Sequence, residues 1–164
     1  MTSLHRRKTD RPAGIVFALL VVACFVAFFL TQHLKHTPTA VQLFKLTPRF
    51  SPTPSGHIKE ERISFKLASA DEVTVAIVDS SGAAVATLLR RLPVPRYKQL
   101  SLRWTGKLGK AHGYELVAGS EGRRAVRARL AGPSAPAGVY RVRVTLRKQH
   151  RSVLSPRSFT LVRG

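Results

Sequence analysis

The chain has 164 residues, about the length of one domain. Lysine and arginine total 28 against 8 acidic residues, which leaves a net charge of +20. Cys24 is the only cysteine, so an intrachain disulfide is excluded and the fold must rest on packing alone. The positive charge predicts attraction to polyanions such as nucleic acid, anionic lipid or acidic cell-wall polymer. The alternative is a solvated basic surface without a specific target.

An uncharged, apolar run near the N-terminus predicts a transmembrane helix over residues 13–32. The 18 residues from Ala13 to Leu30 would span about 27 Å as a helix, close to the hydrocarbon thickness of a bilayer. A cleavable signal peptide is the first alternative, but its apolar core has only about 7–15 residues. A lipoprotein signal that acylates Cys24 is the second, but six more apolar residues follow this cysteine.

Flanking charge predicts the orientation of this helix. Residues 1–12 carry four basic side chains, whereas Lys35 is the only one in the dozen residues that follow the helix. Positive residues tend to stay on the cytoplasmic side of a membrane. The chain is therefore predicted to be a single-pass protein of the cell membrane, with residues 1–12 in the cytoplasm and the C-terminal region outside.

A stretch rich in proline and threonine, residues 33–56, predicts a semi-extended spacer. Proline resists helix formation because it lacks a backbone N–H. Val41–Leu46 has the pattern of a short strand within this stretch. His33 and His36 are three residues apart, but no third or fourth ligand is near, so no metal site is predicted there.

Apolar residues recur with period two in residues 57–164, which is typical of β-strands that bury one face. Asp79 and Gly82 fall between two such runs and predict a hairpin turn. Without helical periodicity, the pattern predicts an all-β fold, an antiparallel β-sandwich. The predicted strands are Ile63–Leu67, Val73–Ile77, Ala83–Leu89, Leu100–Trp104, Val126–Leu130, Tyr140–Leu146 and Phe159–Val162.

Three segments of this region resemble a known family. VTVAIVDSSGAAVATLL (Val73–Leu89), LRWTG (Leu102–Gly106) and PAGVYRVRVTL (Pro136–Leu146) follow the order seen in the immunoglobulin-like β-sandwich of the FlgD type. This domain occurs in flagellar hook-capping proteins and as an accessory module of bacterial surface proteins. The resemblance covers about 75 residues (72–146). It implies an Ig-like sandwich that binds another protein, for example by an exposed sheet edge.

Four residues of these segments are predicted to have structural roles. Trp104 is expected in the core at the end of a strand, and Tyr140 is expected to open a strand. Gly106 and Gly138 are expected to permit tight turns beside them.

Two features depart from the family pattern. Residues 107–135 separate the second and third segments, which usually lie closer together in the family. They form either an extra hairpin, around His112–Ala118 and Arg124–Leu130, or a mobile loop. Nothing in the chain corresponds to the rest of a hook-capping protein, and the membrane anchor argues against a flagellar role.

The segment Tyr140–Leu146 alternates most clearly, with apolar residues on one face and Arg141 and Arg143 on the other. Arginines on a strand face can bind phosphate or carboxylate groups through two hydrogen bonds each. The candidate contacts to an anionic partner are Arg141, Arg143, Arg147, Lys148 and Arg151.

No catalytic, cofactor-binding or metal site is predicted. The sequence has no recognisable set of nucleophile and base and no glycine-rich phosphate loop. Asp79, Ser81 and Gly82 are interpreted as a turn in preference to a calcium site. The adjacent acidic pairs at 60–61 and 71–72 point to opposite faces of a strand, and we expect them to be turn and edge residues that offset the basic surroundings.

The predicted function is that of a non-catalytic, extracytoplasmic interaction module on a membrane anchor. Residues 33–164 carry 24 basic and 7 acidic side chains, a net charge of +17. The partner classes are an anionic cell-wall polymer, the lipid surface or another protein of the cell envelope. An accessory subunit of a membrane or secretion complex fits the same features. With inverted topology the partner would be nucleic acid, although the aromatic residues show no stacking pattern for it.

Overall fold

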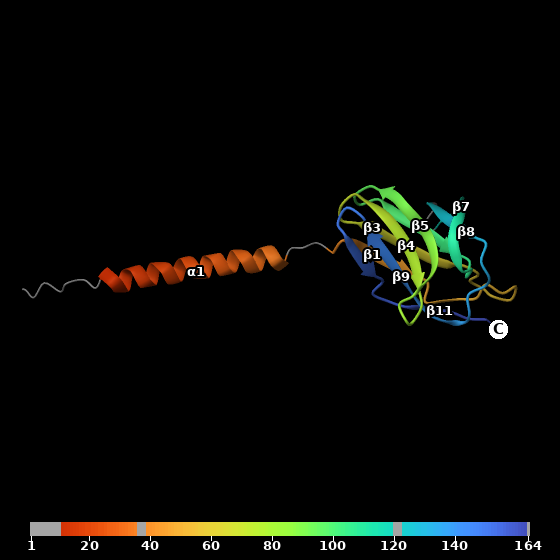
Figure 1. Cartoon of the computed structure of the whole chain (residues 1–164), viewed down its shortest axis with the longest axis horizontal. Coiled ribbons are helices and arrows are strands. Elements are labelled where there is room, and N and C mark those ends of the chain that lie inside the picture. The colour runs from red at the N-terminus through yellow and green to blue at the C-terminus, as the bar shows by residue number, and fades with distance from the viewer. Residues whose placement is uncertain (1–10, 36–38, 120–122, 164) are drawn as a thin grey trace, which may run out of the picture. The chain divides into compact units, whose positions relative to one another are not determined.

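The chain divides into a helical unit, Met1–Pro38, and a β domain, Thr39–Gly164 (Figure 1). The computed structural model describes residues 11–35, 39–119 and 123–163.

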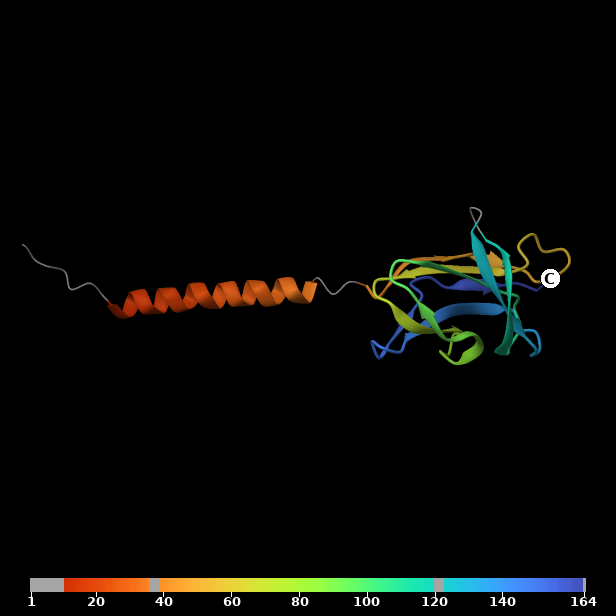
Figure 2. The same ribbon diagram turned by 90° about the horizontal axis from the view of Figure 1, so that it is seen from above.

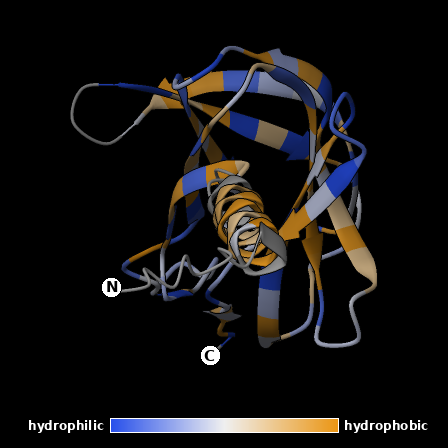
Figure 3. Ribbon diagram, turned by 90° about the vertical axis from the view of Figure 1, so that its left-hand side faces the viewer, coloured by the Kyte–Doolittle hydropathy of each residue, from blue (hydrophilic) through white to orange (hydrophobic). Residues whose placement is uncertain are grey.

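Helix α1 (Arg11–Lys35) contains the predicted apolar segment. Its segment Gly14–Thr31 has a mean hydropathy of 2.8. None of this segment is buried. Figure 3 shows many turns of the helix ribbon in the colour of hydrophobic residues. It is long and apolar enough to cross a membrane, which is a property shared by membrane anchors and signal sequences. The side chains of His33 and His36 lie outside the described residues.

The β domain is built almost entirely from strands, which confirms the predicted β-rich fold. Because apolar residues alternate along most of them, each strand presents one face to a common core. The strands are β1 (Val41–Leu46), β2 (Arg49–Phe50), β3 (Glu61–Leu67), β4 (Asp71–Val78), β5 (Ala84–Val94), β6 (Gln99–Trp104), β7 (Gly109–Ala118), β8 (Arg124–Leu130), β9 (Gly138–Leu146), β10 (Arg151–Leu154) and β11 (Phe159–Leu161).

All of these strands belong to one curled, open sheet. Its order is β1-β3-β6-β8-β7-β5-β4-β9-β11-β2, and β10 pairs with β9 outside this path. The two ends of the path, β1 and β2, are separated by only two residues of chain, so the sheet must bend back on itself. Figure 2 shows strands from its two halves facing each other. The pairing therefore gives one continuous sheet and not two separate ones.

The predicted antiparallel arrangement is correct for most pairs and wrong for three. Residues 107–135 supply a hairpin of β7 and β8, which was one of the two expectations for this segment. This hairpin lies between β5 and β6, which are consecutive in the chain. Inserting an antiparallel pair there makes β5–β7 and β6–β8 parallel. The third parallel pair is β2–β11.

The β domain begins earlier than the sequence pattern predicted. Residues 33–56 were expected to form a spacer, but from Thr39 onward they belong to the β domain. Strand β1 pairs with β3, β2 pairs with β11, and the side chain of Phe50 is 1% exposed. The prolines do not prevent this, because Pro48 lies between β1 and β2 and its carbonyl accepts a hydrogen bond from Thr160.

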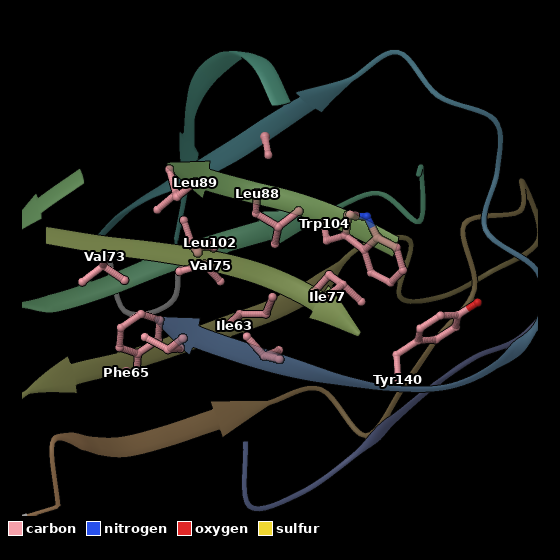
Figure 4. Close-up of a cluster of buried hydrophobic side chains, with 14 of the residues drawn as sticks. Ile63, Phe65, Val73, Val75, Ile77, Leu88, Leu89, Leu102, Trp104 and Tyr140 are labelled. Atoms are coloured by element: carbon pink, nitrogen blue, oxygen red, sulfur yellow. The ribbon is translucent and has the colours of Figure 1, made fainter. Parts of the chain in front are cut away.

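The core lies inside the curl of the sheet (Figure 4). Val73, Val75 and Ile77 of β4 are fully buried and face the interior, as does the apolar set of β9. At one end of this core, aromatic rings from β2, β6, β9 and β11 pack against one another. Trp104 lies 5.6 Å from Tyr140 and 5.6 Å from Phe50 between ring centroids, and 5.9 Å from Phe159. We call Phe50, Trp104, Tyr140 and Phe159 the aromatic cluster.

Asp71, at the start of β4, is a buried carboxylate that organises the turn between β9 and β10. Its Oδ1 accepts hydrogen bonds from the backbone amides of Glu72 and Lys148 at 2.7 and 2.8 Å, and its Oδ2 accepts one from Gln149 at 3.2 Å. The residue is only 2% exposed. The sequence pattern predicted a turn and edge residue that offsets the basic surroundings; Asp71 does serve a turn, but as a buried group whose oxygens are satisfied by three amides in place of water.

Asp71→Ala is expected to lower the free energy of unfolding by about 2–3 kcal/mol, because it leaves amides of a buried turn without an acceptor. Asp79→Ala is the matched control. Asp79 also accepts hydrogen bonds from its own turn, but in an exposed position, so about 1 kcal/mol or less is expected. Urea unfolding of the full chain in non-ionic detergent, followed by Trp104 fluorescence, measures both. Equal losses for the two variants would contradict the role given to Asp71.

Candidate functional site

The outward side of β9 carries the predicted basic residues. Arg141 is exposed, and Arg143 is half-buried with its Nη1 3.5 Å from the carbonyl oxygen of Gly82. Arg147 and Lys148 follow the end of β9, and Arg151 begins β10. The structure therefore spreads these residues along the strand and its following turn.

A shallow depression of about 310 Å³ lies beside the end of β9. Two of the predicted residues, Arg147 and Arg151, line it, whereas Arg141, Arg143 and Lys148 do not. Hydroxyl groups accompany the cations, and the Oγ atoms of Thr145 and Ser152 are 3.0 Å apart. Cationic and hydroxyl donors together suit an oxyanion. The full lining is Thr74, Arg91, Thr145, Leu146, Arg147, His150, Arg151 and Ser152.

Arg91 is the member of this site that sequence reasoning missed. Val73 and Val75 of β4 pair with Leu92 and Leu89, so two residues of β5 bulge out opposite Thr74. Arg91 has a φ of 48° and its amide donates to Oγ1 of Thr74 at 3.3 Å. The bulge turns its side chain toward β9. The sequence contains no glycine or asparagine there that would have indicated it.

One cation of the site already has a partner. Nη1 of Arg147 lies 2.7 Å from Oε2 of Glu72. The hydrogen bond from Arg147 lowers the pKa of Glu72, and the same contact raises the pKa of Arg147. Among the described residues, no carboxylate pairs with Arg91, Arg143 or Arg151. We call Arg91, Arg141, Arg143, Arg147, Lys148 and Arg151 the β9 face.

The residues predicted to have structural roles lie at turns and in the core. Trp104 is fully buried and its Nε1 donates to the carbonyl of Lys107 at 2.8 Å. Tyr140 is 4% exposed and its hydroxyl donates to the carbonyl of Pro136 at 2.8 Å. Gly106 has a φ of 76°, which favours glycine. Gly138 has no positive φ and lies in β9, where it pairs with Leu161 of β11.

Asp79 and Gly82 form the turn between β4 and β5. Oδ1 of Asp79 accepts hydrogen bonds from the amides of Ser81 and Ala83 and from the hydroxyl of Ser81. The Ser81 hydroxyl is the main cause of the lowered pKa of Asp79. Gly82 has a φ of 84°. The carboxylate thus serves its own turn. No three His, Cys, Asp or Glu side chains come together as a metal site within the described ranges.

The acidic pair at 60–61 divides into a half-buried and a fully buried residue. Glu60 forms an ion pair of 2.6 Å with Nε of Arg127, as an offsetting role would require. Glu61 is instead fully buried, opposite Trp104 in the sheet, so the prediction of a turn or edge residue that offsets the basic surroundings is wrong for it. Its Oε1 accepts a hydrogen bond from the amide of Thr47 at 2.8 Å, whereas Oε2 has no partner among the described residues.

Burial raises the pKa of Glu61 from 4.5 to about 8, against a smaller opposite effect of the hydrogen bond from Thr47. The carboxyl group is therefore neutral in the folded chain at pH 7. The group is buried beside Thr47, which follows β1, and it does not line the depression beside β9. We therefore assign it no part in that site.

The chain matches no protein-family model, and no significant similarity to a curated protein or to a solved structure is found.

Glu61 makes stability depend on pH. In the unfolded chain its proton leaves near pH 4.5, whereas in the folded chain it leaves near pH 8. The folded state thus holds more protons between these values, so the free energy of unfolding should fall as pH rises from about 4.5 to about 8 and then level off.

Glu61→Gln keeps the acceptor for Thr47 but cannot ionise. At pH 9 this variant is expected to be more stable than the unaltered chain by roughly 2–5 kcal/mol, and at pH 5 the two should differ by about 1 kcal/mol or less. Urea unfolding at pH 5, 7 and 9 measures the difference. Glu60→Gln is the control and should retain the pH dependence of the unaltered chain. A difference between Glu61→Gln and the unaltered chain that does not grow with pH would show that Glu61 is ionised in the fold.

Proposed function

We propose that the chain is a non-catalytic binding protein, held in a membrane by α1, whose β domain binds an anionic polymer of the cell envelope. The observation that carries the proposal is the β9 face. It presents several arginines that pair with no carboxylate of the described residues, beside a depression lined by hydroxyl groups. Guanidinium groups make paired hydrogen bonds to the phosphate and carboxylate groups of such polymers.

The proposed binding is dispersed and electrostatic. All cations of the β9 face except the half-buried Arg143 are exposed, and they follow a strand and its turn, an arrangement that suits a long chain of repeated charges more than one small ligand. Interactions between exposed charges are screened over about 8 Å at physiological ionic strength, so the affinity should fall steeply with salt.

The fold belongs to the proposal as well. We infer that the curled sheet is a variant of the Ig-like sandwich of the FlgD type. Three placements support this: the turn of Asp79 and Gly82 joins β4 to β5, Trp104 ends β6, and Tyr140 lies near the start of β9. These are the positions that the resemblance implies. The β7–β8 hairpin would then be the insertion that departs from the family pattern.

The β9 face is tested by a variant with Arg91, Arg143 and Arg151 replaced by glutamine. The control replaces Lys98, Lys110 and Arg124, which are also exposed but lie away from the depression, and so has the same net charge. On immobilised polyglutamate, the β9-face variant is expected to elute at a clearly lower salt concentration than the control, because only it loses the clustered donors. Elution at the same salt concentration would mean that overall charge alone governs retention.

The anchor and its orientation are tested with a tag at the N-terminus and a compartment-sensitive reporter after Gly164. We expect the tag to stay on the full-length chain in the membrane fraction and the reporter to be active only outside the cytoplasm, because positive charge precedes α1. Loss of the tag would identify a cleaved signal sequence. If the reporter is active only in the cytoplasm, the β domain faces the cytoplasm, and nucleic acid takes the place of the envelope polymer as the proposed partner.

A further inference from the structure

A second group of basic residues lies on the half of the sheet that contains β3, β6 and β8. Arg62 of β3 is the register partner of Arg103 of β6, and Arg103 is the register partner of Arg127 of β8. Side chains directly opposite on neighbouring strands lie about 5 Å apart, and like charges in this position repel each other. We call Arg62, Arg103 and Arg127 the arginine ladder.

Arg103, in the centre of the ladder, is unusually buried for an arginine. It is 7% exposed. Its Nη2 donates to the carbonyl of Ala118 at 3.1 Å, and no carboxylate within the described ranges forms an ion pair with it. Burial and then the charge of Arg62 lower the pKa of Arg103. Buried arginines are nearly always paired with an anion, so Arg103 lacks the partner that its burial requires.

Two depressions in the surface meet at Arg62 and Arg103. The smaller, about 130 Å³, is lined by polar side chains that include Thr47, Ser64 and Ser101. The larger, about 400 Å³, is lined by the third ladder residue, Arg127, with its ion-pair partner Glu60, and by His57 and Lys59. Arg103 lines both, and its guanidinium donates to the carbonyl of Ala118, which lines the larger depression.

The positive charges in the ladder are only partly compensated, because the negative charge of Glu60 acts on Arg103 against the larger effects of burial and of Arg62. Arg127 is balanced by Glu60 at 2.6 Å, with Glu115 3.5 Å away. Arg62 and Arg103 form no ion pair in the part of the chain that the structure describes. A phosphomonoester carries nearly two negative charges at neutral pH and has three oxygens that accept hydrogen bonds. Its charge and acceptors match the two guanidinium groups better than a carboxylate, which has one charge and two oxygens.

We propose that the arginine ladder is a binding site for a single phosphate group, held by Arg62 and Arg103 with Arg127 beside them. The site lies on different strands from the β9 face and is independent of the polymer binding proposed above. It takes one compact dianion, whereas the β9 face takes an extended polyanion.

Titration of inorganic phosphate into the full chain in non-ionic detergent tests the site, with isothermal calorimetry at constant ionic strength. We expect saturable binding of one phosphate. Arg103→Lys should weaken it at least about tenfold, because lysine keeps the charge but not the paired donors. Arg129→Lys is the matched control. Arg129 is also on β8 but is exposed and lines neither depression, so its replacement should leave the affinity unchanged.

Folding and function are kept apart by two further variants. Arg62→Gln removes an exposed ladder side chain, so it should weaken phosphate binding without lowering the midpoint of thermal unfolding, even where Arg103→Lys unfolds. The glutamine variant of the β9 face should bind phosphate normally. Absence of saturable binding, or equal affinities in Arg62→Gln, Arg103→Lys and Arg129→Lys, would overturn the proposal. It would leave the polymer test unaffected.

The source of the phosphate is distinguished by repeating the titration in phosphatidylcholine vesicles without and with phosphatidic acid. If a lipid headgroup fills the site, phosphatidic acid should abolish the Arg103-dependent heat of phosphate binding. If a soluble phosphomonoester is the ligand, the heat should persist in both vesicles, and glycerol 3-phosphate should compete with inorganic phosphate. Both outcomes require the ladder. If Arg103→Lys and the unaltered chain give the same heat of phosphate binding in both kinds of vesicle, the proposed site is contradicted.

Discussion

The aromatic cluster is the contact on which the β domain depends. Its four rings come from β2, β6, β9 and β11, so they join the first segments of the domain to its middle and its end. No disulfide is available to do this. Since aromatic side chains bury the largest apolar areas, this packing stabilises the curl of the sheet. The curl then determines which side of each strand faces outward, and so where the arginines lie.

The two buried carboxylates show how differently one fold can treat a charge. Asp71 receives three backbone amides and organises the turn that places Arg147 beside Glu72. Glu61 receives one amide and keeps one oxygen without a partner. The three amides thus satisfy both carboxylate oxygens of Asp71, whereas burial holds Glu61 neutral, because a half-satisfied charge opposite Trp104 would be expensive.

Much of the strand content could be predicted from the sequence, because alternation of apolar residues is a local property. The segments 73–77 and 140–146 lie within β4 and β9. The pairing could not be predicted: nothing local shows that the β7–β8 hairpin separates β5 from β6. The basic site was predicted where it followed one strand. Arg91 was missed because a bulge in β5 turns its side chain toward β9. The pairing of Arg62 with Arg103 was missed because it depends on the register between β3 and β6.

The two basic regions differ in what their charges cost. Exposed arginines on the β9 face are stabilised by water and counterions, so their presence needs no ligand to explain it, and salt weakens anything they bind. Arg103 is almost completely shielded from water, and it lies opposite Arg62 on the neighbouring strand. Replacement by an apolar residue would remove both costs. A charge retained in such a place has its clearest physical explanation in an anion that returns the lost solvation energy, and burial protects that contact from screening by salt.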